Sequence, residues 1–495
     1  MNVASVTGPH VTIQLDKSSA KMKTAHLRAV GIKSRSALAA ARACIKMAQR
    51  AGLDSWAVQD GIKAVSTTPK DYTHDPVWRD LATVLIDEKS ARKQFVARKQ
   101  PAPWHKWGTQ LDDGSIQQMK NACNLPISVA GALMPDAHTG YGLPIGGVLA
   151  TDNAIIPYAV GVDIACRMKL TVVDIPIHKL EKQRSRLIEA IEAETRFGVG
   201  CTFSPPRHHP VMEDRAWKEI DILRELKPKA IEQLGTSGSG NHFVEFGLLE
   251  VSKGDFNLAP GQYMALLSHS GSRGTGESIA KHYSNLAMRK HPELPRDLAH
   301  LAWLDMDSQE GREYWRAMTL MGQYSAANHQ LIHEHIIGHL GIGVLAGIEN
   351  HHNFAWREVH NGREVIVHRK GAIPAGKGVL GIIPGTMVSQ AHIVRGKGNP
   401  LSLNSAAHGA GRAMSRKAAI KRFSWNDMER ALQHNDVHLI SAGLDEAPMA
   451  YKDIKKVMAA QHDLVESIAL FHPRLVKMSP ADKFRSRKGK KGWHR

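Results

Sequence analysis

Long apolar runs are missing from this chain of 495 residues. A helix needs about 20 consecutive apolar residues to cross a bilayer, and Met1–Val30 also lacks the apolar stretch of a signal peptide. We therefore expect no membrane span and a cytoplasmic protein. Cysteine is scarce as well, and the four thiols are too scattered for a disulfide framework, which favours a reducing compartment. They are Cys44, Cys123, Cys166 and Cys201.

Acidic residues are outnumbered, with 47 Asp and Glu against 65 Lys and Arg, for a net charge of +18. Such an excess favours a polyanionic partner such as RNA, although solubility alone is the simpler explanation. Aromatic residues make up only 6% of the chain, whereas its 28 histidines equal Phe, Tyr and Trp combined. Abundant histidine favours metal binding or proton transfer.

Two common nucleotide motifs are also missing. Gly371–Gly378 (GAIPAGKG) nearly matches a P-loop, but Gly378 stands where a Mg²⁺-binding Ser or Thr is required, and Pro374 removes a cradling N–H group. There is no K-x-D-G lysine motif of the kind that ordinary ligases use as the nucleotide-accepting nucleophile. Any nucleotidyl transfer here needs another nucleophile, and a histidine in a glycine-rich turn is the obvious one.

The composition and hydrophobic pattern of the chain change near residue 102. Residues 1–102 are basic and predict helices at Ser36–Arg50, Asp54–Ala64 and Val77–Ile86, with Ser36 and Asp54 as N-caps. Residues 103–480 alternate β-branched runs, glycine turns and helical patterns, the longest at Lys179–Phe197 and Arg296–His335. This alternation predicts one large mixed α/β (α+β) domain with a small helical N-terminal appendage. Residues 481–495 predict a basic disordered tail.

Two segments carry side chains of the metal-ligand type. Asp163 and Cys166 stand three residues apart in a glycine-flanked turn, close enough to grip one ion or bridge two, although a structural cysteine is the simpler alternative. In Gly240–Glu245 (GNHFVE), strand parity puts Asn241 and Glu245 on one face and His242 on the other. One face could hold a metal while the other reads a base.

Further segments combine histidines or cations with glycine. Ser268–Gly274 (SHSGSRG) suits a phosphate site, and of the neighbours His351 and His352 only one can point to a given site. In Ser405–Arg412 (SAAHGAGR) a histidine heads a glycine turn, and a helix starting there would put Arg412 and Arg416 on one face. Taken singly, each segment is better explained as an ordinary glycine turn with solvated cations.

Taken together, these segments resemble the RtcB family of RNA ligases in order and spacing, from about Pro103 to Lys477. The motifs that carry the resemblance are MPDAHTGYGLPIGG, GVDIACRM, LGTSGSGNHFVE, HSGSRG, HRKGA, IIPGTM, SAAHGAGRAMSR and DEAPMAYKD. The resemblance implies a divergent, bacterial-type member with an N-terminal extension. Its implied reaction is GTP- and Mn²⁺-dependent joining of RNA 3′-phosphate or 2′,3′-cyclic phosphate ends to 5′-hydroxyl ends, in tRNA splicing or RNA repair.

The resemblance also implies roles for particular residues. His408 matches the histidine that attacks GTP and passes the guanylate to the RNA 3′ end. The ligands of two Mn²⁺ ions match Asp163, Cys166, His242, His269 and His352, with Cys166 as the bridging thiolate. Residues matching the nucleotide contacts are Asn241, Glu245, Asn353, Gly409, Ala410, Gly411, Tyr451 and Lys477. Cations matching phosphate or RNA contacts are Arg273, Lys370, Arg412 and Arg416. The expected partner is RNA, and the enzyme itself is expected to be a monomer; the need for an activating protein, of the kind that some relatives require, is left open by the sequence.

The chain departs from the family pattern at four positions. Ala165 and Arg167 stand where glycines are usual, beside the metal ligands, while Thr386 and Val388 replace the usual Ser and Gly of a nucleotide loop. These changes bear on metal and nucleotide selectivity. Two other functions remain open: a metal-dependent RNA cyclic phosphodiesterase or nuclease, and a noncatalytic RNA-binding relative.

Overall fold

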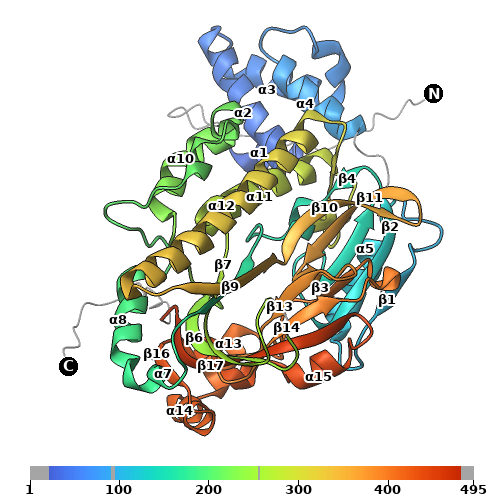
Figure 1. The fold of residues 1–495 in the computed structure, drawn as a ribbon. Coiled ribbons are helices and arrows are strands. Elements are labelled where there is room, and N and C mark those ends of the chain that lie inside the picture. Colours follow the sequence, from blue (N-terminus) through green and yellow to red (C-terminus); the bar gives the residue numbers. More distant parts are fainter. Residues whose placement is uncertain (1–21, 91–94, 255–256, 481–495) are drawn as a thin grey trace, which may run out of the picture. The chain divides into compact units, whose positions relative to one another are not determined.

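A computed structural model describes residues 22–90, 95–254 and 257–480 (Figure 1). The chain divides into two compact units, with the boundary after residue 94 rather than after residue 102. The predicted basic tail lies outside the described residues. Within the described ranges, no helix combines the length and apolar character that a bilayer crossing requires.

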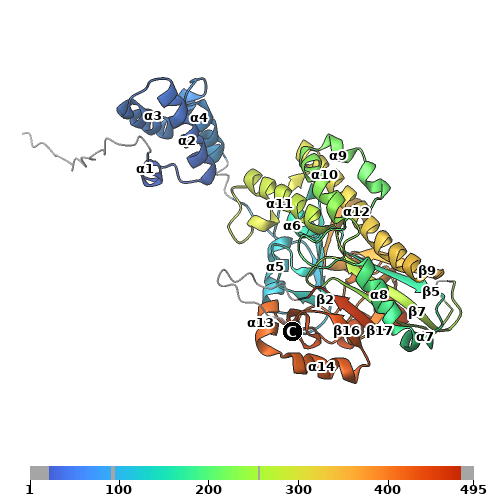
Figure 2. The same cartoon turned by 90° about the vertical axis from the view of Figure 1, so that its left-hand side faces the viewer.

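The smaller unit consists of helices, and Figure 2 shows α2, α3 and α4 packed together. Its helices are α1 (Thr24–Ala29), α2 (Arg35–Arg50), α3 (Ser55–Thr67) and α4 (Arg79–Ser90). Asp54 caps α3 as predicted, its Oδ1 accepting from the Ala57 N–H at 2.8 Å. The cap of α2 is Ser34 rather than Ser36, because the Ser34 hydroxyl accepts from the Ala37 N–H. Leu27, Ile62 and Leu81 are buried where these helices meet.

The larger unit is built on two main sheets, which confirms the mixed α/β class. One has the strand order β1 (Trp104–Lys106), β2 (Ser128–His138), β3 (Ile145–Thr151), β11 (Arg363–Lys370) and β10 (Asn353–His360). The other has the order β13 (Leu380–Ile383), β14 (Ala391–Gly396), β17 (Val465–Met478), β6 (Phe243–Val251), β7 (Gly261–Ser270), β5 (Arg167–Val173) and β9 (Val344–His351), with β16 (His438–Ser441) beside β17. Two short pairs join β12 (Ala372–Pro374) to β15 (Ser405–Ala407) and β4 (Ala154–Ile155) to β8 (Leu304–Asp305).

Helices cover the sheets, and α11 and α12 lie side by side in Figure 1. The longer helices are α5 (Asp113–Cys123), α8 (Arg184–Glu194), α10 (Asp221–Gln233), α11 (Arg273–Lys290), α12 (Gln309–Leu340) and α14 (Trp425–His434). The shorter ones are α6 (Pro157–Val160), α7 (Lys179–Lys182), α9 (Ala216–Glu219), α13 (Arg416–Arg422) and α15 (Ile454–Ala459). The helix predicted at Arg296–His335 begins only after its cap at Ser308, and the one predicted at Lys179–Phe197 is divided into α7 and α8.

Strand register gathers the histidines and the cysteine at one end of the larger sheet. The antiparallel pairs place Phe243 opposite His269 and Arg167 opposite His351. His242 precedes Phe243, Cys166 precedes Arg167, and His352 follows His351, so all of these side chains meet where β5, β6, β7 and β9 end or begin. Backbone pairing alone therefore assembles residues that are far apart in the sequence.

Gly411 is a second point where distant segments meet, and alanine there is expected to destabilise the larger unit. Its φ is +71°, and a β carbon would lie 2.2 Å from the carbonyl oxygen of Asp136. We expect Gly411→Ala to lower the free energy of unfolding by about 3 kcal/mol or more, because the backbone must move as well as adopt a left-handed conformation. Gly378→Ala is the matched control, since its φ is +81° but an added β carbon would meet no other segment of the protein within 4 Å; it should cost about 1 kcal/mol. Equal losses in urea-induced unfolding would show that the contact with Asp136 is unimportant.

Candidate active site

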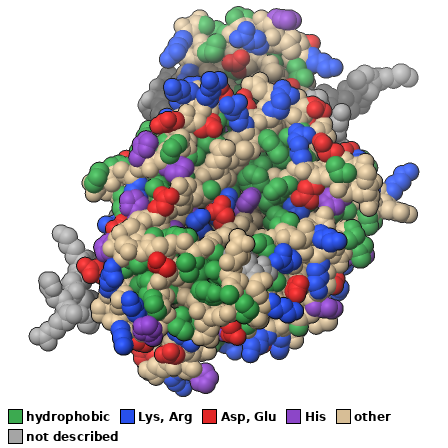
Figure 3. Space-filling model, viewed as in Figure 1, with side chains coloured by type: hydrophobic (Ala, Val, Ile, Leu, Met, Phe, Trp, Pro, Cys, Tyr) green, Lys and Arg blue, Asp and Glu red, His purple; other side chains and the backbone are tan. Residues whose placement is uncertain are grey.

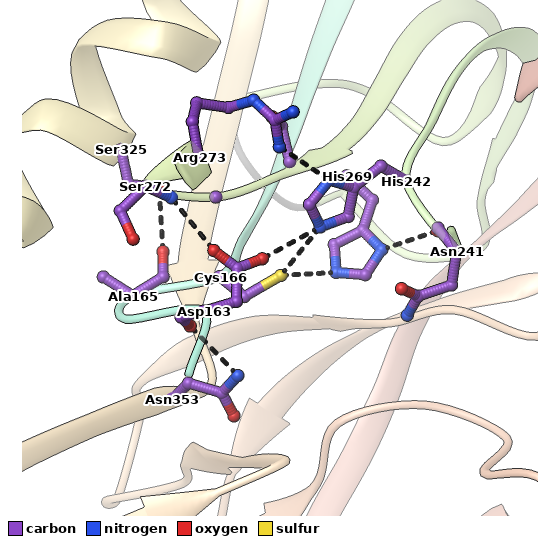
Figure 4. Close-up of polar contacts among 12 residues, drawn as sticks. Asp163, Ala165, Cys166, Asn241, His242, His269, Ser272, Arg273, Ser325 and Asn353 are labelled. Atoms are coloured by element: carbon purple, nitrogen blue, oxygen red, sulfur yellow. Dashed lines mark hydrogen bonds and ion pairs between the residues drawn. The ribbon is translucent and has the colours of Figure 1, made fainter. Parts of the chain in front are cut away.

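Five ligand-type side chains converge at this end of the sheet. Figure 4 labels four of them: Asp163, Cys166, His242 and His269. The Sγ atom of Cys166 lies 3.1 Å from Nε2 of His269 and 3.4 Å from Nε2 of His242. Asp163, Cys166 and His242 form one trio, and Cys166, His269 and His352 form another, with ligand atoms within 4.8 Å of one another in each. Cys166 belongs to both trios. Oxygen, nitrogen and sulfur donors in this arrangement fit metal binding.

Neighbouring groups orient these ligands. Nδ1 of His269 lies 3.0 Å from the carbonyl oxygen of Asn241, so this nitrogen carries the proton and Nε2 keeps its lone pair for a metal. The Ser272 N–H donates to Oδ1 of Asp163 at 3.1 Å, which leaves Oδ2 beside His242 at 3.0 Å. Side chains held in this way need little rearrangement to bind an ion.

Burial sets the charge of the cluster. Desolvation lowers the pKa of His269 to about 3 and that of His352 well below its usual value, so both imidazoles are neutral. Burial alone would raise the pKa of Asp163, but the hydrogen bond and charge of His242, together with Arg273, outweigh it and lower that pKa. Desolvation, with the Asp163 charge, raises the pKa of the Cys166 thiol well above normal. The thiol is therefore the one ligand that needs a bound cation to become ionised.

His408 stands next to this cluster, its ring centroid 4.9 Å from that of His352. Its Nδ1 lies 2.6 Å from Oδ2 of Asp136, a carboxylate on β2 that is fully buried. Because that carboxylate accepts the Nδ1 proton, it selects the imidazole tautomer whose lone pair is on Nε2, the nitrogen that can act as a nucleophile. Sequence analysis gave Asp136 no role, although its motif, Met134–Gly147, was part of the family resemblance.

A cavity of about 290 Å³ adjoins His408. Asn241, Phe243 and Glu245 line it, whereas His242 faces the metal-type cluster, which is the alternation that strand parity predicts. Desolvation raises the pKa of Glu245 well above normal, which favours the neutral carboxylic acid, a form that can donate as well as accept a hydrogen bond. The remaining predicted nucleotide contacts on its wall are Gly409, Ala410, Gly411 and Tyr451.

The other two predicted nucleotide contacts are not on that wall. The amide of Asn353 is used inside the protein, donating to the Asp163 carbonyl oxygen at 3.1 Å and accepting from the Gly371 N–H at 2.8 Å. On β17, Val476 and Met478 line the cavity, while the ammonium of Lys477 lies 5.8 Å from the centroid of the Phe197 ring. In this structure the Asn353 side chain links the loop that carries Asp163 and Cys166 to the turn at Gly371. The Lys477 side chain points away from the cavity.

The four predicted cations lie in different settings. Arg273 is 3.4 Å from Nδ1 of His242, and burial lowers the pKa of Lys370 to about 7. The helix expected near His408 starts only at Arg416, after its cap at Ser415, so the prediction that one helix face presents both arginines is wrong. Arg412 lies in the preceding loop, with its guanidinium bonded to the protein.

Both guanidinium groups nevertheless reach the same carboxylate. Nη1 of Arg412 lies 3.2 Å from Oε2 of Glu446, and Nη2 of Arg416 lies 3.1 Å from Oε1. Arg412 is also committed to the Tyr451 hydroxyl at 3.1 Å and the Asp445 carbonyl oxygen at 2.6 Å. Arg416 has a side chain that is 45% exposed, so it is the freer of the two to meet a phosphate.

The four departures from the family pattern are accommodated locally. Ala165 adopts a left-handed φ of +55°, and its carbonyl oxygen accepts from the Ser325 hydroxyl at 2.8 Å. The charge of Arg167 is paired with Glu349 at 2.7 Å. Thr386 lines the cavity and bonds to the Ser389 hydroxyl at 2.8 Å, whereas Val388 is not on the cavity wall.

The chain is similar to known proteins over most of its length. The profile of the family described as tRNA-splicing ligase RtcB matches residues 118–478. The chain belongs to the RtcB family. It is 36% identical to the RNA-splicing ligase RtcB of Escherichia coli K12 over 408 residues, covering 74% of this chain and 95% of that protein. The tRNA-splicing ligase RtcB of Methanococcus maripaludis is 31% identical over 446 residues, covering 75% and 91%.

The RtcB match contains every predicted site residue and both main sheets except β1. It does not reach the smaller helical unit, whose described residues end at 90. An RtcB homologue of Entamoeba dispar is 28% identical over 415 residues, so the likeness extends to a eukaryotic relative.

Proposed function

We propose that this RtcB protein is a GTP- and Mn²⁺-dependent RNA ligase. It joins RNA 3′-phosphate or 2′,3′-cyclic phosphate ends to 5′-hydroxyl ends, in tRNA splicing or RNA repair. The observation that carries the proposal is the pairing of His408 with the buried carboxylate of Asp136 beside a cavity and two ligand trios. A histidine paired with a carboxylate acts either as a nucleophile or as a general base that activates water in a hydrolase, and formation of a covalent GMP adduct distinguishes the two.

In the first step, Nε2 of His408 attacks the α-phosphorus of GTP, forming a P–N bond as the P–O bond to pyrophosphate breaks. The Nδ1 proton stays on the ring, and the carboxylate of Asp136 stabilises the positive charge that develops there. The walls of the cavity, including Glu245 and Tyr451, hold the nucleotide in line with His408.

A 2′,3′-cyclic phosphate end is first opened by water, which adds to phosphorus as the bond to the 2′ oxygen breaks. An oxygen of the RNA 3′-phosphate then attacks the guanylate phosphorus, and the P–N bond breaks with its electron pair returning to His408. The 5′-hydroxyl oxygen then attacks the activated 3′-phosphate, losing its proton to solvent and releasing GMP. Metal ions bound by Asp163, Cys166, His242, His269 and His352 would supply positive charge and polarise phosphoryl oxygens.

RNA binding is supported by the charge of the chain, which is +18 overall. Lys and Arg side chains lie across the face shown in Figure 3, interspersed with acidic ones. Such a surface binds the sugar–phosphate backbone with little sequence preference and with strong salt dependence. Arg273 and Arg416 are the cations that we assign to phosphates near the reacting ends. We further propose a cytoplasmic monomer that works with or without an activating protein; all four cysteines are free thiols.

The test is incubation of the purified protein with GTP labelled at the α-phosphate and Mn²⁺, followed by a denaturing gel. We expect a labelled protein band that is labile in acid and stable in alkali, as a phosphoramidate is, and no band from GTP labelled at the γ-phosphate. A protein that binds the metal but takes up no label, yet opens 2′,3′-cyclic phosphate RNA, would be a phosphodiesterase instead. RNA binding with neither activity would indicate a noncatalytic relative.

A further inference from the structure

Three aromatic rings form a cluster that the nucleotide chemistry does not use. The rings of Tyr158 and His300 are 4.5 Å apart between centroids, and Tyr141 lies 5.7 Å from His300 and 6.5 Å from Tyr158. They come from three separate segments: the turn after β2, the helix α6 and a single 3₁₀ turn at Ala299–Leu301. Tyr141 is 69% exposed although its ring contacts two other aromatic rings, and so large an exposed fraction is unusual for a ring packed in this way.

The cluster is held firmly in place. Gly142, with a φ of +69°, brings its backbone so close to the neighbouring segment that a β carbon would lie 2.7 Å from the carbonyl oxygen of His300. The ammonium of Lys370 donates to the carbonyl oxygen of Tyr141 and lies 5.9 Å from the centroid of the Tyr158 ring. The ring of Tyr141 is therefore presented to solvent on a fixed backbone.

The cluster also lies close to the reacting groups. Lys370 immediately precedes Gly371, where a β carbon would be 3.2 Å from Cε1 of His408. Tyr158 is on α6, which ends just before Gly161 and Asp163. Yet neither tyrosine nor Lys370 lines the cavity beside His408. A ligand on the exposed ring would thus be near the site of ligation without competing for the nucleotide cavity.

We propose that Tyr141, supported by His300 and Tyr158, is a stacking platform for a nucleobase of the RNA strand close to the end being joined. Lys370 lies behind the platform, where its ammonium, bonded to the Tyr141 carbonyl oxygen, fixes the backbone that carries the ring. Every base has an apolar face, so stacking on an exposed aromatic ring binds single-stranded RNA with little sequence preference. This inference rests on the proposed RNA substrate and adds to it the place where an RNA base is held.

The test measures binding rather than turnover, with a fluorescent 5′-hydroxyl RNA oligonucleotide and the full chain in the presence of Mn²⁺. Loss of one stacked base costs about 1–3 kcal/mol, so we expect Tyr141→Ala to raise the Kd roughly 5- to 150-fold. Tyr141→Phe should bind as the unchanged protein does, because it keeps the ring. Trp425→Ala is the matched control, since Trp425 is an exposed aromatic residue on α14 and should leave the Kd unchanged.

A second series places one abasic nucleotide at successive positions of the oligonucleotide. At one position the unchanged protein should lose affinity, and there Tyr141→Ala should cause no further loss. The platform would be overturned by an unchanged Kd for Tyr141→Ala, or by an equal loss of affinity in Tyr141→Phe. It would also be overturned if no abasic position lowered the affinity of the unchanged protein, a result that would point to a protein contact at this surface. Because binding is measured without GTP, these outcomes are distinct from a failure of the proposed ligation, which the GMP-labelling experiment reports.

Discussion

His408→Ala is expected to abolish the covalent GMP adduct, and with it the joining of RNA ends. Among the described histidines, only His408 has its Nδ1 bonded to a carboxylate, lines the cavity and belongs to neither ligand trio. The adduct would be followed with α-labelled GTP on a denaturing gel. Its complete loss is predicted because the alanine side chain has no atom that could attack the α-phosphorus.

Metal binding distinguishes loss of the nucleophile from loss of the fold. His408 belongs to neither trio, so His408→Ala should retain the same number of Mn²⁺ ions per chain as the unchanged protein, measured by equilibrium dialysis and elemental analysis. A labelled band that persists in His408→Ala would show that another residue is the nucleophile.

Asp136→Asn is expected to slow formation of the adduct by about 10³- to 10⁴-fold, by analogy with the Asp→Asn change in a Ser-His-Asp triad. The amide keeps the shape of the carboxylate, but its nitrogen donates rather than accepts. It therefore favours the imidazole tautomer whose proton sits on Nε2, the nitrogen that must attack. The apparent affinity for GTP should change little, because Asp136 is not on the cavity wall.

Single-turnover labelling at saturating GTP measures this rate directly. Asp54→Asn provides the control, because Asp54 caps α3 in the smaller unit and asparagine is an equally good cap. A labelling rate within tenfold of normal in Asp136→Asn would mean that the buried carboxylate only supports the fold.

Local features of both units could be predicted from the sequence. Asp54 was identifiable as a cap because its bond spans three residues. The two faces of GNHFVE followed from strand parity, which needs no knowledge of the rest of the fold. The start of α12 was misplaced because Arg296–Asp307 has helical composition, whereas the structure uses part of it as strand β8 and a 3₁₀ turn. Tertiary pairing overrides propensity there.

Pairings between distant segments needed the structure. Asp136 and His408 are separated by 272 positions, and no periodicity connects them. Arg412 and Arg416 were expected to share a helix face, but they meet at Glu446 through loop geometry instead. The ligand residues themselves were identified through the family resemblance, since each motif alone was compatible with an ordinary glycine turn.

The position of β17 has a consequence for how the enzyme is made. This strand is the last one described along the chain, yet it pairs with β14 on one side and β6 on the other, in the middle of its sheet. During synthesis from the N-terminus, the strands on either side of β17 stay as two separate, incomplete groups until Val465–Met478 has left the ribosome. Val476 and Met478 also complete the wall beside His408. A nascent or prematurely terminated chain therefore lacks a finished nucleotide site, and the chemistry of the protein begins only after translation has passed this strand.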